Sequence, residues 1–207
     1  MATTAIILQS VSLAVVLFAS TNLDDIFVLI GLFADRRYHV RSIVVGQYLA
    51  IFFLVCLSAV AALMALVIPS EYVGLLGFVP ALIGVKRLID LRGKKEEQDF
   101  VVGMKPTRVH AQALSVGLIT VANGGDNLGV YIPAFAVHSA AEIAIITVIF
   151  AVMTAIWLFL AHWMVNHRML RKPLQRYGSV LAPLVLIALG CNILYQANSL
   201  AVIASFL

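Results

Sequence analysis

The chain contains six apolar runs, each long enough to cross a lipid bilayer, and this feature limits its fold more than any other. A transmembrane helix needs about 20 apolar residues to cross about 30 Å of hydrocarbon. A transmembrane β-strand would instead show about 10 residues of alternating polarity, which these continuous runs lack. We therefore expect an all-α integral membrane protein with six transmembrane helices. The runs cover residues 5–34, 42–68, 72–91, 111–137, 143–165 and 178–207.

Composition supports this class of protein. The chain is 62% hydrophobic and 12% charged, whereas a soluble domain is about 45–50% apolar and about 25% charged. A soluble fold, a disordered chain and a nucleic-acid-binding protein are excluded on this basis. We expect one transmembrane domain over residues 1–207, with the lipid bilayer as its surroundings and no cofactor. The first run lacks the basic flank of a secretory signal, so we expect it to stay in the mature protein.

The basic residues predict the orientation in the membrane. All 14 lysines and arginines fall in the first, third and fifth connections between the apolar runs, or at their edges. The positive-inside rule therefore places these connections in the cytoplasm and both termini outside. The longest connection, about 93–108, is expected to be a solvated cytoplasmic loop. It joins two halves at about 1–92 and 109–207.

The two halves show a weak internal similarity. A shift of 102 residues places Asp24-Asp25 on Asp126-Asn127, and a shift of 106 residues relates Gly84 to Gly190. Three helices per half would make the second copy inverted in the membrane. Inverted 3+3 repeats recur in secondary transporters, which bind their substrates near the midplane, where the repeats meet.

Three aspartates are expected deep in the membrane. Asp25 precedes Asp35 by ten residues, which is about 15 Å along a helix and half of the hydrocarbon thickness. Asp126 lies at a similar depth in the fourth run. Each carboxylate there costs about 2.5–3.5 kcal/mol, and Asp24 beside Asp25 adds repulsion between like charges. Because we expect every lysine and arginine at the cytoplasmic side, protons or a bound metal ion remain to neutralise the carboxylates.

Polar neighbours of these acids favour an ion. Thr21 and Asp24, and likewise Asn123 and Asp126, are three residues apart, so each pair is expected to share one helix face. Gly124-Gly125 would let the fourth helix break and expose backbone carbonyls to a cation. The alternative is that the acids only join helices through hydrogen bonds. The metal-binding candidates are Asp24, Asp25, Asp126, Thr21, Asn22, Asn123 and Asn127, followed by Gly124, Gly125, Gln47 and Cys191.

Other polar or soft side chains allow two interpretations each. Gln47 would either line the pathway or form an interhelical hydrogen bond. Cys56 and Cys191 would be soft metal ligands or small buried thiols. His162 would relay protons or lie at the membrane interface, and Trp157 is expected to serve in packing.

At residues 21–29 and 122–133 the sequence resembles the cadmium resistance transporter (CadD-like) family, part of the LysE superfamily of small bacterial exporters. Residues 46–49 are similar to the family's motif in the second helix. The resemblance implies export of divalent cations across a bacterial plasma membrane, with the three aspartates in the matching acidic motifs. Related superfamily members handle manganese, other divalent metals or basic amino acids.

The leading hypothesis is therefore a multi-pass secondary transporter rather than an enzyme. No Walker-type nucleotide-binding motif occurs, so an ion gradient would drive transport, with protons as the counter-ion. Cd²⁺ comes first by resemblance, although oxygen ligands suit Mg²⁺, Mn²⁺ or Ca²⁺ at least as well. A homodimer would suit so small a bundle.

Three alternatives stay open. The first is an exporter of cationic amino acids, whose charge the same acids would neutralise. The second is an intramembrane aspartyl hydrolase, although Gly124-Gly125-Asp126 is not the Gly-x-Gly-Asp signature of such enzymes. The third is a purely structural or channel-subunit role, and the flux of a channel would not depend on a counter-ion gradient.

Overall fold

The computed structural model describes residues 2–65, 74–90, 109–166 and 171–196. Over these ranges all regular structure is helical, with eight α-helices, one 3₁₀ turn and no strand, which confirms the expected all-α class. The 93–108 connection and both chain ends lie outside the described residues. The elements are α1 (Ala2–Thr21), α2 (Asp25–Ala34), α3 (Val40–Ala65), η1 (Gly74–Gly77), α5 (Phe78–Asp90), α6 (Val109–Asn123), α7 (Gly125–Ala136), α8 (Ala140–Asn166) and α9 (Arg171–Gln196).

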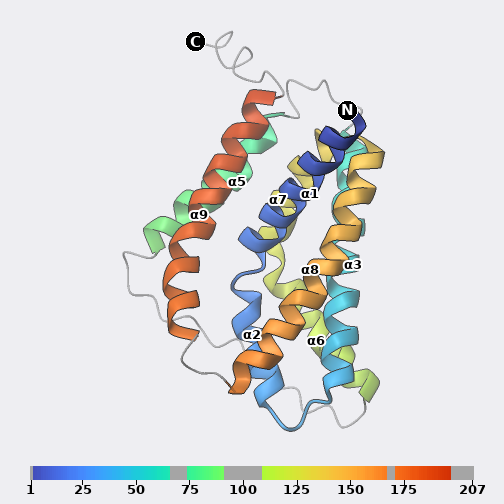
Figure 1. Ribbon diagram of the computed structural model, residues 1–207, viewed down its shortest axis with the longest axis vertical. Helices are drawn as coiled ribbons and strands as arrows, with labels where there is room; N and C mark the ends of the chain where they lie inside the picture. The colour runs from blue at the N-terminus through green and yellow to red at the C-terminus, as the bar shows by residue number, and fades with distance from the viewer. Residues whose placement is uncertain (1, 66–73, 91–108, 167–170, 197–207) are drawn as a thin grey trace.

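The helices form a bundle in which most neighbours run roughly side by side (Figure 1). α3 packs on α6 and α7, while α1 and α2 pack on α8. α5 and α9 pair with each other at one side of the bundle, and α5 also contacts α7. Elements from the two halves of the chain are therefore interleaved throughout.

Within the described ranges, two single helices are long and apolar enough to cross a membrane, Val40–Met64 and Ala140–Val165. A third crossing is obtained if Ile7–Thr21 and Asp25–Ala34 count as one span, bent by 63° at the break. The expected third and sixth spans fall partly on residues outside the described ranges. The number of six spans and the inverted repeat thus stay predictions.

The first expected span breaks although residues 22–24 contain no glycine. Local side chains add hydrogen bonds to the backbone carbonyls at the end of α1, and the Phe18 carbonyl also accepts one from the backbone N–H of Asn22. Thr21 Oγ1 donates to Leu17 O at 3.0 Å, and Asn22 Nδ2 donates to Phe18 O at 3.0 Å. Such side-chain hydrogen bonds compete with continued helix. Because α1 ends at Thr21, the expectation that Thr21 and Asp24 share the face of one helix is wrong.

The second break lies where two glycines predicted it. α6 ends at Asn123, Gly124 precedes α7, and α7 begins at Gly125. Asn123 and Asp126 therefore belong to different helices, and the expectation of a shared helix face is wrong here too. In both motifs an aspartate therefore lies in the first turn after a break, Asp25 in α2 and Asp126 in α7.

Glycines allow two helix pairs to approach very closely. A Cβ atom added to Gly46 of α3 would lie 2.4 Å from the carbonyl oxygen of Ala113 and 2.7 Å from Val116 Cβ, both on α6. One added to Gly84 of α5 would lie 2.6 Å from the carbonyl oxygen of Pro183 on α9. Small residues allow such backbone contact between helices in membranes. Both pairs join the first half of the chain to the second.

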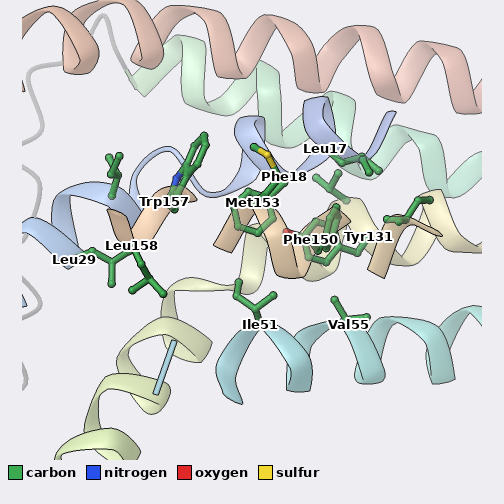
Figure 2. Packing of buried hydrophobic residues seen from close by; sticks show 14 of the residues in the cluster. Leu17, Phe18, Leu29, Ile51, Val55, Tyr131, Phe150, Met153, Trp157 and Leu158 are labelled. Atoms are coloured by element: carbon green, nitrogen blue, oxygen red, sulfur yellow. The ribbon is translucent and has the colours of Figure 1, made fainter. Parts of the chain in front are cut away.

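Aromatic side chains fill the core beside the first break (Figure 2). The ring of Phe18 on α1 meets the edges of Phe150 and Trp157 on α8, with centroids 5.4 and 5.5 Å apart. Tyr131 on α7 lies 4.8 Å from Phe150 by the same measure. Edge-to-face rings at these distances attract each other beyond the effect of their burial. This cluster holds α1, α7 and α8 together where the polar side chains begin, as expected for Trp157.

Candidate functional site

The two acidic motifs lie against each other in the structure. Asn127 Nδ2 donates a hydrogen bond to Asn22 Oδ1, and Asn123 Nδ2 donates one to Asp25 Oδ1, each at 3.2 Å. Asn22 and Asn127 are almost fully buried. Each motif thus contributes polar groups to a shared site between the two halves of the chain.

A tyrosine and a tryptophan support this site from the aromatic cluster. Tyr131 Oη accepts a hydrogen bond from Asn22 Nδ2 at 2.9 Å and lies 3.1 Å from Thr21 Oγ1. Trp157 Nε1 donates to the backbone carbonyl of Asn22 at 2.7 Å. The sequence indicated no role for Tyr131 and only a packing role for Trp157. The available signal was general, since buried tyrosine and tryptophan need partners for their polar atoms.

Asp25 is the most buried of the three acids, with 6% of its surface exposed. Its Oδ1 accepts the hydrogen bond from Asn123, whereas its Oδ2 is buried and has no hydrogen-bond partner among the described residues. A buried polar atom without a partner is costly. A proton on this oxygen would remove the charge of the carboxylate, and a metal ion would supply the missing partner.

Arg87 binds the other two acids, which corrects a central expectation. Its Nη2 donates to Asp24 Oδ2 at 3.0 Å and also to Asp126 Oδ2. The prediction that no lysine or arginine accompanies these carboxylates is therefore wrong. Both contacts are hydrogen bonds between charged groups, which are the stronger kind.

The packing of α5 on α7 explains how Arg87 reaches the site. A Cβ added to Gly129 of α7 would lie 2.7 Å from Ile83 Cδ1 of α5, so the helices touch there. Arg87 lies four residues after Ile83, and Asp126 lies three residues before Gly129, so each pair shares a helix face. The contact thus places the guanidinium beside the carboxylate. No signal in the sequence of α5 alone would have indicated this.

The site in this structure is a charged network and not a closed metal cage. No group of three or more His, Cys, Asp and Glu side chains in the described ranges is arranged to hold a metal ion. Asp25 nevertheless lies within electrostatic range of Asp24, Asp126 and Arg87. The side chains of Asp24 and Asp126 are 49% and 38% exposed at the surface of the bundle.

Comparison with known families decides where the chain belongs. A sequence model of the cadmium resistance transporter family matches residues 18–206, nearly the whole chain. The chain belongs to the cadmium resistance transporter family. This confirms the resemblance found in its motifs, and together with the apolar helices it supports a membrane transporter. No curated protein and no solved structure is significantly similar to the chain.

In this member of the cadmium resistance transporter family, the remaining candidate residues lie apart from the charged network or at its border. Gln47 is buried and accepts a hydrogen bond from Thr120 Oγ1 at 2.7 Å, which favours the interhelical role. Cys56 and Cys191 are exposed on α3 and α9, so the expectation of buried thiols is wrong. His162 is exposed and contacts the ring of Phe33 edge-on, with centroids 5.0 Å apart.

The two glycines of the second motif differ in their surroundings. A Cβ added to Gly124 would lie 2.6 Å from Leu54 Cδ1 on α3, so this residue is packed. Gly125 is exposed, and a Cβ added there would meet no atom within 4 Å. Gly124 thus brings α3 close to the break, whereas Gly125 borders open space.

Replacing Tyr131 with phenylalanine is expected to destabilise the protein by about 1–2 kcal/mol, because buried polar groups of Thr21 and Asn22 lose their shared partner. Equilibrium unfolding in mixed detergent and SDS micelles measures the change. Tyr48→Phe is the matched control, since the Tyr48 hydroxyl donates to the Ala151 carbonyl at an exposed position. Equal destabilisation by both variants would contradict the expectation that the Tyr131 hydroxyl stabilises the protein more than an exposed hydroxyl does.

Proposed function

We propose that this protein exports divalent metal cations, Cd²⁺ first, across the bacterial plasma membrane. Family membership supports a metal as the substrate. The Asp24, Asp25 and Asp126 carboxylates form the proposed binding site. Thr21, Asn22, Asn123 and Asn127 supply or position further oxygen ligands there.

The charge of the site is the observation that carries this proposal. Three carboxylates interact with one guanidinium, that of Arg87. With all three acids ionised, the formal excess is two negative charges, which one divalent cation neutralises. Protons on the same acids neutralise them equally, so exchange of metal for protons keeps the site neutral in both states. Proton antiport is the coupling that we propose.

Alternating access of two inverted halves is the proposed mechanism. Each half begins with a broken helix followed by a long one, α1–α2 with α3 and α6–α7 with α8. The two breaks contact each other, as expected for a site at the interface of two repeats. The proposal includes six spans, both termini outside and, as its oligomeric state, a homodimer.

The chemistry of the ligands limits the choice of metal. Oxygen ligands suit Mg²⁺ and Mn²⁺ at least as well as a soft ion, while both cysteines are exposed on α3 and α9. We keep Cd²⁺ first on the strength of the family and expect Mn²⁺ to compete with it.

One observation favours a second candidate function, export of a cationic amino acid. Asp24 and Asp126 already hold a guanidinium, that of Arg87. The side chain of free arginine carries the same group. Arginine would therefore find two matching carboxylates at this site.

Flux measurements in proteoliposomes test both candidates. The purified protein would be reconstituted and assayed for Cd²⁺, Mn²⁺ and Mg²⁺ flux, with and without an imposed pH gradient and with arginine or lysine as competitors. Metal flux that depends on the pH gradient supports the proposal. Flux of arginine without flux of any metal would overturn it in favour of the amino-acid exporter.

A further inference from the structure

We infer that Arg87 is a tethered counter-ion, which occupies the cation position between Asp24 and Asp126 until the transported cation displaces it. This inference rests on the proposed function. It concerns a residue of α5, a helix outside both acidic motifs. The guanidinium of Arg87 is the positive charge opposite the aspartates that the sequence did not reveal.

The contacts of Arg87 place its charge where a substrate cation would bind. One nitrogen, Nη2, contacts Oδ2 of Asp24, just before α2, and Oδ2 of Asp126 in the first turn of α7. These two oxygens belong to different motifs and are brought together by a single positive group. A metal ion bound by both oxygens would stand next to that group. Two positive charges at such a distance repel strongly, so the guanidinium gives up its contacts to these two oxygens while its charge stays beside the site and still counts in the charge balance.

Displacement of the guanidinium agrees with the exposed fractions of the side chains. The Arg87 side chain is 22% exposed, and those of Asp24 and Asp126 are more exposed. The guanidinium is therefore not sealed into the core, in contrast to Asp25, which is buried. A long arginine side chain can turn away without unfolding its helix.

Competition from Arg87 lowers the affinity for the metal. The acids bind metal only in the fraction of molecules in which the guanidinium has left, and the apparent dissociation constant rises accordingly. A transporter gains from this, because a site that binds too tightly does not release its cargo. Arg87 restores the ion pairs as the metal leaves.

The same exchange changes how α5 is held. α5 contacts α9 through the close approach of Gly84 to Pro183, whereas Arg87 ties it to Asp24 and Asp126. Displacement of the guanidinium removes only the second connection. Binding of a cation therefore removes the charged connection of the α5–α9 pair to the two broken helices, while the apolar contact of Ile83 with Gly129 on α7 and the pair itself stay intact.

Metal binding to the full-length protein in detergent tests the inference. Cd²⁺ and Mn²⁺ titrations by calorimetry would compare the wild type with Arg87→Gln and Arg87→Lys. We expect Arg87→Gln to lower the dissociation constant about tenfold or more, because the competing charge is gone. Arg87→Lys keeps one charge but loses the forked guanidinium geometry, so its dissociation constant should fall between the two. Lys86→Gln is the matched control, since Lys86 is exposed on the same helix and its loss should change nothing.

The outcomes separate this inference from the proposed function. If the wild type binds metal and Arg87→Gln binds it equally or more weakly, Arg87 is not a competing cation and the inference fails alone. If neither protein binds any of the metals, the proposed function fails as well. Should Arg87→Gln not yield monodisperse protein, Arg87→Lys decides, and binding no tighter than wild type overturns the inference.

Discussion

Asp126→Asn is expected to reduce metal flux in proteoliposomes by about a hundredfold or more, because intramembrane carboxylates that pair with charge carry the function of such sites. The substitution keeps the shape of the side chain but removes one negative charge. With Arg87 still present, the remaining excess no longer matches a divalent cation. Asp24 alone would then hold the guanidinium. Insertion and folding should persist, which size-exclusion chromatography of the purified variant checks.

Asp35→Asn is the matched control for this experiment. Asp35 lies in the turn after α2, where Arg37 Nε donates to its Oδ1 at 2.9 Å. Hydrogen bonds from Arg37 lower the pKa of the Asp35 carboxyl, so it is charged at neutral pH. The control therefore removes the same charge outside the site, and its flux should equal that of the wild type. Equal flux in the Asp126 variant would return Asp126 to a structural role.

Gly46→Ala is expected to destabilise the protein by about 2–3 kcal/mol, since overpacking of a tight contact forces the backbone to move. The new methyl group would lie 2.4 Å from the carbonyl oxygen of Ala113, a backbone atom that no rotation of a side chain can move. α3 and α6 would have to separate. Unfolding in mixed detergent and SDS micelles measures the loss.

Gly31→Ala gives the same change of residue without the contact. A Cβ added to Gly31 of α2 meets no atom within 4 Å. Alanine is also the better helix former, by about 0.8–1.0 kcal/mol. Stability should therefore stay level or rise in this variant. Similar losses in both variants would mean that the α3–α6 contact is more adaptable than its geometry indicates.

The sequence predicted the parts of the structure that depend on local pattern. Continuous apolar runs predicted helices, and helices are what the described residues form. The Gly124-Gly125 pair predicted a break, because glycine weakens a helix wherever it occurs. The similarity of the two motifs suggested that they meet, and Asn123 and Asn127 do contact the first motif.

What the sequence did not reveal depends on partners far away in the chain. At the break after Thr21, side chains bind backbone carbonyls, but the same residue types also occur within intact helices. Arg87 looked like an interfacial residue because its partner acids are 39 and 63 positions distant. Tyr131 and Trp157 acquire their roles only when α7 and α8 pack beside the first break.

The break between α1 and α2 also limits how this transporter can evolve. Asn22 binds the end of α1, Tyr131 and Asn127 at once, so a new residue there would change the helix path together with the proposed substrate site. A substitution of Asn22 that changed the ion preference would therefore also destabilise the protein. A side chain at Gly125 would make no such contacts, because this residue borders open space at the second break. Variation in ion preference between related transporters is accordingly expected to accumulate at Gly125 before it reaches Asn22.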